Sequence, residues 1–226
     1  MTRGNTDMTA ALGGLTSTQL SILKGGAAGC ESVQTIIDIA ATAEAFAVTA
    51  LGGALQNAAN GQLGLNENHI LHIKAARAAE QAHFDYLTSA GAKPLTTTFT
   101  VPDEKIVTDV PTFLKTLVAL EEAFIAAYLA AAQEFVVMGE GELAKVALQI
   151  GAVEAEHRAG VRFFAIEAGV LSGTPNDVAF EKAMFTSVGE AAQLLKDLGF
   201  IGGNGPEITY PGPGEIDYSG VKNLKP

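Results

Sequence analysis

The sequence predicts an all-α protein whose core is a four-helix bundle made of two helical hairpins. Within its 226 residues, apolar side chains recur at the helical period of about 3.6 in four long segments. Short turns separate the first segment from the second and the third from the fourth, so each pair must form antiparallel neighbours. About 18 residues join the two pairs, and at about 3.3 Å each they can run the length of a long helix. Strand-like alternation is too brief to support a competing α/β fold.

Local signals mark where the helices begin and end. Asn66 and Glu67 suit the N-cap and the first turn of the second helix, and Pro111 suits the start of the third. The Thr-rich, Pro-bounded stretch 93–111 predicts a long connection that forms no sheet of its own. We therefore expect the bundle helices at about residues 32–60, 66–90, 111–138 and 142–169.

Further elements are expected outside the bundle, which itself takes up residues 31–170. Thr16 opens a short helix within an N-terminal extension over 1–30, because Gln19 completes a capping box. A fifth helix is expected within 171–200, from about Asp177 to about Leu198. The Gly/Pro-rich tail 201–226 has too few apolar residues to pack by itself and is expected to lie extended on a surface.

Charge and composition exclude several classes of partner. The net charge is −11, and no basic cluster interrupts it, so nucleic acid and anionic membranes are not expected partners. The longest uncharged stretch, 45–66, contains amide side chains and glycines and is not expected to span a membrane. Lys24 interrupts the apolar residues before the lipoprotein-like sequence 27–30, and a single cysteine, Cys30, fits a reducing compartment. We expect a cytoplasmic protein and leave export open.

Each long helix carries at least one ionisable side chain on its apolar stripe. An ionised carboxylate in a dry core costs several kcal/mol, and four that face one another repel strongly. Such groups must therefore be protonated, paired with cations, or bound to metal. Two divalent ions would balance four carboxylates and leave two histidines neutral. The candidate metal ligands are Glu44, Glu80, His83, Glu121, Glu154 and His157.

The spacing of these residues makes the pattern more specific. Glu80 and His83, like Glu154 and His157, are three residues apart and therefore share one helical face. A further glutamate, in the helix before, precedes the two pairs by 36 and 33 residues respectively. The candidate site is thus internally two-fold in sequence, as a centre with two metal ions requires.

Four segments that contain these ligands resemble the ferritin-like domain family, which includes desiccation-related and other stress-associated proteins. More distantly they are similar to bacterioferritin, rubrerythrin and manganese catalase. The resemblance covers about residues 31–170 and includes all six ligand positions. It implies a ferritin-like bundle with its long crossover between the second and third helices, and a complete dinuclear site. The segments are 41–49, 80–86, 120–128 and 154–157.

Two positions depart from that resemblance. Bacterioferritin-type sites often carry an acidic residue directly before each Glu-x-x-His glutamate, where it orients a histidine, but Ala79 and Val153 occupy those places here. The residues that orient the ligands must then lie elsewhere. Asp85, Tyr86 and Tyr128 are the candidates for this supporting role.

Several assignments leave alternatives open. Glu121 shares the apolar stripe, but Glu122 stands before Ala-Phe as Glu44 does and is the competing ligand. Glu156 is expected to be solvated or paired with Arg158. His69 and His72 are expected to be surface or end-of-bundle histidines rather than ligands.

The general alternative is a metal-free bundle whose buried glutamates pair with arginines. Arg77, Arg158 and Arg162 lie on the same helices as the candidate ligands and are the available partners.

The leading hypothesis is a protein that binds two iron or manganese ions and reacts with dioxygen or peroxide. If it is an enzyme, it is an oxidoreductase: iron would imply oxidase or ferroxidase activity, and manganese would imply peroxide disproportionation. The alternative is a structural or stress-protective assembly that uses the bundle as a scaffold without catalysis. In that case segment 207–215 would dock on a neighbouring subunit, and a homo-oligomer is expected. The tail and the fifth helix make an iron-storage cage a poor match.

Overall fold

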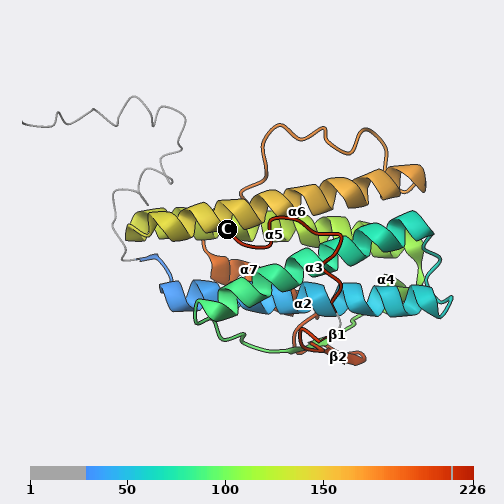
Figure 1. Cartoon of the computed structure of the whole chain (residues 1–226), viewed down its shortest axis with the longest axis horizontal. Helices are drawn as coiled ribbons and strands as arrows, with labels where there is room; N and C mark the ends of the chain where they lie inside the picture. Colours follow the sequence, from blue (N-terminus) through green and yellow to red (C-terminus); the bar gives the residue numbers. More distant parts are fainter. Residues whose placement is uncertain (1–28, 215) are drawn as a thin grey trace, which may run out of the picture.

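A computed structural model describes residues 29–214 and 216–226. Four long helices lie side by side as the expected all-α bundle (Figure 1). The short helix expected at residues 16–25 lies outside the described residues. The bundle helices are α2 (Val33–Ala59), α3 (Glu67–Ser89), α5 (Val110–Met138) and α6 (Gly141–Glu167).

The predicted helix-end signals are present in the structure. The Asn66 side chain accepts a hydrogen bond from the backbone N–H of His69 and so caps α3. Asp109 caps α5 in the same way, because its side chain accepts a hydrogen bond from the backbone N–H of Thr112. Pro111 occupies the first turn of α5. Gly139 ends α5 with φ 83°, a left-handed conformation that only glycine adopts without strain.

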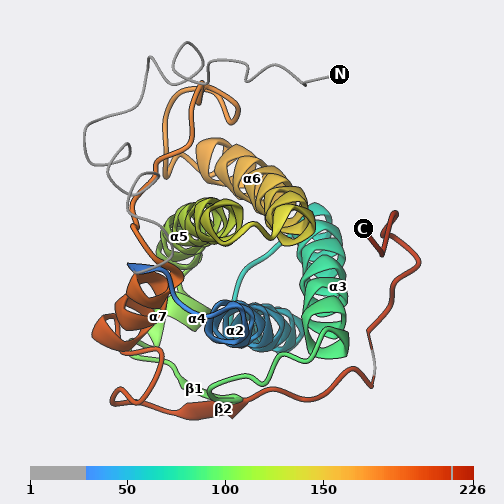
Figure 2. The ribbon, with the colours of Figure 1, turned by 90° about the vertical axis from the view of Figure 1, so that its left-hand side faces the viewer.

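The two hairpins contact each other at fewer points than the two helices within each hairpin do. Viewed end-on, α2, α3, α6 and α5 follow one another around the bundle (Figure 2). The pairs α2–α3 and α5–α6 are in extensive contact, whereas α3 and α6 approach each other at few points. α2 and α5 also approach each other at few points, but α7 packs against both of them, so the side between α3 and α6 is loosely closed without such a helix among the described residues.

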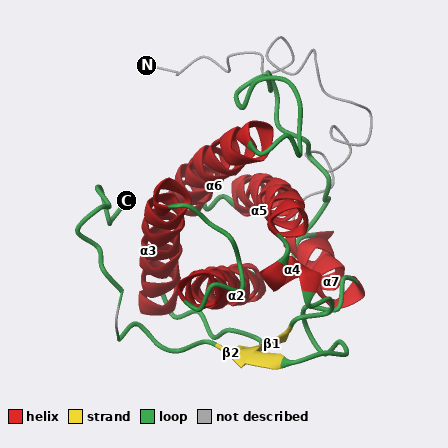
Figure 3. Ribbon diagram, turned by 90° about the vertical axis from the view of Figure 1, so that its right-hand side faces the viewer, coloured by secondary structure: helices red, strands yellow, loops and turns green. Residues whose placement is uncertain are grey.

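The crossover between the hairpins contains more structure than its sequence predicts. It includes β1 (Thr98–Thr100) and a single helical turn, α4 (Lys105–Thr108). β1 pairs antiparallel with β2 (Glu207–Thr209) from the tail, with Phe99 opposite Ile208 (Figure 3). The crossover thus forms no sheet of its own, as expected, but it joins a sheet whose partner strand comes from a distant part of the chain that local patterns cannot identify.

The fifth helix is shorter than expected. α7 (Val188–Asp197) has 10 residues and packs against α2 and α5, whereas the expected helix began at about Asp177. The preceding stretch 171–187 is irregular, and Gly173 adopts φ 102° just before Pro175. Ion pairs hold this stretch in place of helical hydrogen bonds: Arg162 pairs with Asp177, and Arg158 pairs with Glu181.

The apolar core consists of two clusters that occupy the two ends of the bundle. One contains Phe46, Phe124 and Ile150 with many neighbours, and the other contains Leu51, Phe164 and others. Along α3 and α6, the boundary between the clusters falls where the Glu-x-x-His pairs stand. A polar layer therefore separates two dry regions near mid-bundle.

Helix α2 passes a length-and-composition test for a membrane span, and within residues 29–214 and 216–226 it is the only helix that does. However, 72% of its most apolar stretch is buried inside the bundle. Helix α2, which overlaps the stretch 45–66 that we expected not to span a membrane, is thus apolar because it forms part of the core.

Glu134 on α5 anchors two segments that reach the bundle from outside it. Its carboxylate accepts the backbone N–H of Glu31 at 2.8 Å and that of Val188 at 3.1 Å, and it is only 3% exposed. Replacing Glu134 by alanine should lower the free energy of unfolding by about 1–3 kcal/mol, because buried N–H donors lose their acceptor. Urea denaturation measures this loss.

The matched control is Glu142→Ala, which removes an exposed carboxylate from the surface of α6. It should change stability by less than about 0.5 kcal/mol. Equal stability of the two variants would contradict the anchoring role of Glu134.

Candidate metal centre

Six side chains from the four bundle helices meet in the polar layer between the two apolar clusters. We call them the carboxylate–histidine cluster. α2 contributes one of them, α3 two, α5 one and α6 two. Its members are Glu44, Glu80, His83, Glu121, Glu154 and His157, so the structure brings all six predicted ligands together.

The cluster divides into two overlapping groups of possible ligands. In the first, ligand atoms of Glu44, Glu80, His83 and Glu154 all lie within 4.8 Å of one another. His83 Nδ1 is 3.4 Å from Glu44 Oε2, 3.3 Å from Glu80 Oε2 and 3.4 Å from Glu154 Oε1. One imidazole nitrogen therefore faces three carboxylates.

The second group repeats this arrangement around the other histidine. It comprises Glu80, Glu121, Glu154 and His157, again with ligand atoms within 4.8 Å of one another. His157 Nδ1 is 3.0 Å from Glu80 Oε1 and 3.3 Å from Glu154 Oε2. Glu80 and Glu154 belong to both groups, so each can bridge two ions, while the other residues each serve one.

Burial makes this arrangement costly without a cation. Glu80 and Glu154 are 0% exposed, and Glu44 and Glu121 are nearly as buried. Each of the four carboxylates has one oxygen without a hydrogen-bond partner among the described residues. Unpartnered oxygens that converge from four helices are the donor set that a divalent metal ion satisfies. The cluster is therefore compatible with a dinuclear metal site.

The protonation of the metal-free cluster follows from the same burial. Desolvation, reinforced by the nearby Glu80, raises the pKa of Glu44 well above its ordinary value. Desolvation together with Glu154 does the same to the pKa of Glu121. Burial would also raise the pKa of Glu80, but His157 beside it outweighs that effect and holds the pKa well below the usual range. Protons on Glu44 and Glu121 thus neutralise part of the negative charge that metal ions would otherwise balance.

The two histidines balance the rest of the negative charge of the carboxylates. Burial disfavours their charged forms, yet the surrounding carboxylates outweigh it and raise the pKa of His83 and of His157 well above the ordinary value. Without metal, both imidazoles therefore carry protons that a metal ion would have to displace.

Of the three residues considered for a supporting role, Tyr128 contacts a member of the cluster. Its hydroxyl donates a hydrogen bond to Glu44, and the phenol ring is buried. Gly151 on α6 makes room for it, since a Cβ there would lie 3.1 Å from Tyr128 Cβ. Asp85 instead accepts hydrogen bonds from Gln81 and Tyr218.

The structure also distinguishes the competing glutamates. Glu121 lies inside the cluster, whereas Glu122 points outward and pairs with Lys182 at 2.9 Å. Glu156 is exposed, as expected, although Arg158 pairs with Glu181 rather than with it. His69 and His72 pack against Phe164 at the end of the bundle.

The arginines that could neutralise the buried carboxylates are engaged elsewhere. Arg158 and Arg162 pair with acidic residues of the irregular stretch 171–187, and Arg77 Nε donates to the carbonyl of Val48. Within the described part of the chain, no lysine or arginine forms an ion pair with the cluster. The alternative in which arginines neutralise the buried glutamates is therefore not what the described residues show, and the two histidines are the cationic partners of the carboxylates there.

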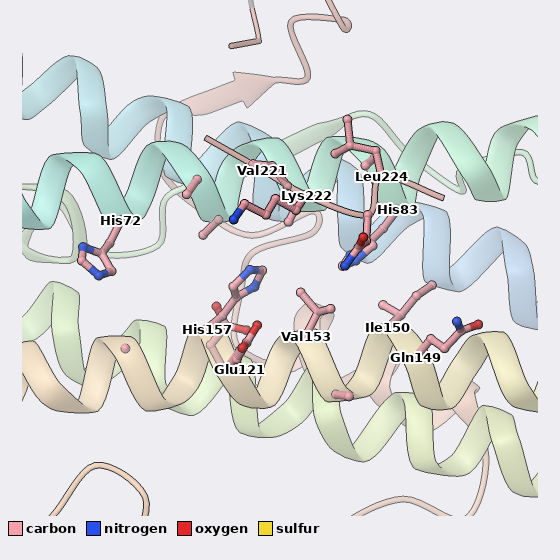
Figure 4. A pocket seen from close by; sticks show the side chains of 18 of the residues that line it. His72, His83, Glu121, Gln149, Ile150, Val153, His157, Val221, Lys222 and Leu224 are labelled. Atoms are coloured by element: carbon pink, nitrogen blue, oxygen red, sulfur yellow. The ribbon is translucent and has the colours of Figure 1, made fainter. Parts of the chain in front are cut away.

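A cavity of about 940 Å³ opens on the cluster from the loosely closed side between α3 and α6. His83, Glu121 and His157 line its floor, and side chains of the last seven residues form its outer wall (Figure 4). We call it the α3–α6 cavity.

Sequence reasoning missed the residues that place that outer wall. Tyr210 donates a hydrogen bond to the buried Gln81, next to the ligand Glu80, and Tyr218 donates to Asp85. Gln81 follows a recognised motif residue, but no local signal links it to a tyrosine 129 positions later.

Comparison with protein families agrees with this architecture. The model of the ferritin-like domain matches residues 40–167, which is more than half of the chain and includes all six members of the cluster. Neither the curated proteins nor the solved structures give a match. With the bundle, its long crossover and the matched residues taken together, the chain belongs to the ferritin-like domain family.

Proposed function

We propose that this protein binds two iron or manganese ions in the carboxylate–histidine cluster and carries out redox chemistry on dioxygen or peroxide. The observation that carries the proposal is the overlap of the two ligand groups in Glu80 and Glu154. A pair of carboxylates shared between two ligand sets, with one glutamate and one histidine left for each ion, fits a dinuclear centre. The four carboxylates would balance two divalent cations.

When bound, the metal pair supplies the electron transfer that dioxygen or peroxide requires. The protein's own residues hold and shield it. Tyr128 orients the Glu44 carboxylate through its hydrogen bond, and the two apolar clusters exclude bulk water from both ends. The α3–α6 cavity leaves one route by which an oxidant reaches the two histidines.

The donor set does not select between the two metals, because carboxylates and imidazoles accept both iron and manganese. The deciding experiment purifies the protein without added metal, loads it with either ion, and measures metal content, oxygen consumption and peroxide disproportionation. Two ions per chain with oxygen consumption would assign an iron oxidase or ferroxidase, and peroxide loss with manganese would assign a catalase-like activity. A metal content near zero that loading cannot restore would overturn the proposal.

The affinity for metal should rise with pH. Metal binding displaces protons from Glu44, Glu121, His83 and His157, all of whose pKa values are raised in the metal-free cluster. Binding therefore becomes more favourable as protons become scarcer. Equilibrium dialysis with Mn²⁺ at about pH 6 and about pH 8 should show more than about tenfold tighter binding at the higher pH. An affinity that stays constant would contradict proton displacement.

The scaffold alternative depended on a tail that docks on a neighbouring subunit. In the structure the tail packs on its own chain: β2 pairs with β1, and Tyr210 stacks on Phe84 with ring centroids 4.7 Å apart. That observation no longer favours a scaffold. A homo-oligomer and a cytoplasmic location stay predictions.

A further inference from the structure

The α3–α6 cavity is much larger than the small oxidants of the proposed function require. It measures about 940 Å³, whereas a molecule the size of water takes up about 30 Å³. Its volume is instead in the range of sites that hold organic ligands, about 300–1,000 Å³.

The cavity is elongated and its walls are mainly apolar. On α3 it extends from His72 to Tyr86, which corresponds to about 21 Å of helix at about 1.5 Å per residue. Ile73, Val161 and Phe164 line the end away from the cluster, and Val153 lines the cavity between His157 and Ile150 (Figure 4). Such a lining favours a long apolar molecule over a compact polar one.

Small residues keep the cavity open. Ala76, Ala79 and Ala82 line it from α3, and Gly160 lines it from α6. A Cβ built on Gly160 would meet no atom within 4 Å, so this helical position borders open space. Glycine inside a helix costs about 1 kcal/mol relative to alanine, and packing does not require it here.

The cavity leads directly to the candidate metal centre. Glu121 is 3% exposed, lines the floor, and has an oxygen without a partner. The side chains of His83 and His157 are 13% and 12% exposed and line the floor beside it. A molecule in the cavity would therefore lie against the groups that hold the ions.

The C-terminal segment 216–226 completes the site from outside. Tyr218, through Asp85, ties it to α3, and Val221 and Leu224 line the outer wall. This wall partly encloses the cavity along α3.

We propose that the α3–α6 cavity binds an unbranched aliphatic chain as an organic substrate, placed along α3 with part of the chain beside His83 and His157. The role of this aliphatic chain as a substrate rests on the function proposed above. Binding itself depends only on the apolar walls and the open space, so it can be tested with or without metal.

The experiment measures binding of lauryl alcohol and of lauric acid to the full chain by calorimetry, with ethanol as a short-chain control. We expect both long-chain probes to bind and ethanol not to bind. Similar affinities for the two would mean that the apolar walls dominate, and tighter binding of the acid would add a contribution from Lys222 and Lys225 at the outer wall.

Two matched variants locate the site. Gly160→Leu places a side chain in the open space and should weaken binding of lauryl alcohol at least about tenfold. Gly53→Leu makes the same exchange inside α2, where a Cβ also meets no atom within 4 Å and which does not line the cavity, so its affinity should be unchanged. Both exchanges give the same gain in helix propensity.

Metal content and unfolding temperature are measured on the same samples. Absence of binding to the wild type, or equal binding by Gly160→Leu and Gly53→Leu, would overturn the inference. If Gly160→Leu fails to fold, Ala76→Leu on the opposite wall is judged by the same criteria. A wild type that holds two ions but binds no long chain refutes the inference alone. One that binds the chain but never metal refutes the proposed function, and the cavity is then a binding site whose ligand is not a substrate.

Discussion

Replacing Glu80 by glutamine is expected to empty both metal positions at once. Glu80 belongs to both ligand groups and is fully buried, and its two oxygens face different histidines: Oε2 is 3.3 Å from His83 Nδ1 and Oε1 is 3.0 Å from His157 Nδ1. An amide of the same size cannot supply two anionic oxygens to two ions. Even partners that only orient a ligand contribute about 10–100-fold to metal affinity, so loss of a shared ligand should cost more than about 100-fold for each ion.

Glu121→Gln should behave differently, because Glu121 belongs to one group alone. Metal analysis after loading should find about two ions per chain in the wild type, about one in Glu121→Gln and close to none in Glu80→Gln. Glu122→Gln is the matched control: it changes the neighbouring residue, which pairs with Lys182, and should keep both ions. Two ions in Glu80→Gln would refute its bridging role.

Replacing Phe46 by alanine should produce the largest loss of stability. Phe46 is 2% exposed, and its ring lies 5.3 Å from that of Phe99, 5.0 Å from Phe200 and 6.5 Å from Phe124. It therefore joins α2 to the crossover, to the chain after α7 and to α5. Truncation of a buried phenylalanine costs about 3–5 kcal/mol.

Thermal unfolding provides the measurement. For a domain of this size, 1 kcal/mol corresponds to about 2–4 °C, so Phe46→Ala should lower Tm by about 6–20 °C. Phe180→Ala removes a ring that is 92% exposed and should change stability by no more than about 0.5 kcal/mol. Equal shifts in the two variants would show that the aromatic contacts around Phe46 do not carry the packing of crossover and tail.

The bundle could be predicted because its helices are specified locally. The 3.6-residue period, the Asn66 cap and Pro111 are all short-range signals, and each has its expected role in the structure. The length of the crossover then selected the bundle topology, because a connection of that length can run along a whole helix between the two hairpins. These features need no information from distant residues.

The expected α7 was too long, because the sequence between the bundle and α7 carries competing interactions. Asp177 and Glu181 suit an exposed helical face, but they pair with Arg162 and Arg158 on α6 instead. Helix propensity is a weak preference that such tertiary contacts override.

By itself the sequence determined the all-α class, the two hairpins and five of the six cluster residues, because periodicity and spacing are properties of neighbouring positions along one chain. The tertiary structure alone decided that Glu121 rather than Glu122 faces the other carboxylates, that β1 finds its partner in β2, and that the C-terminal segment walls a cavity beside the cluster. Helical phase leaves neighbouring residues ambiguous by one position, and contacts between segments more than a hundred residues apart depend on how surfaces fit after the helices have packed.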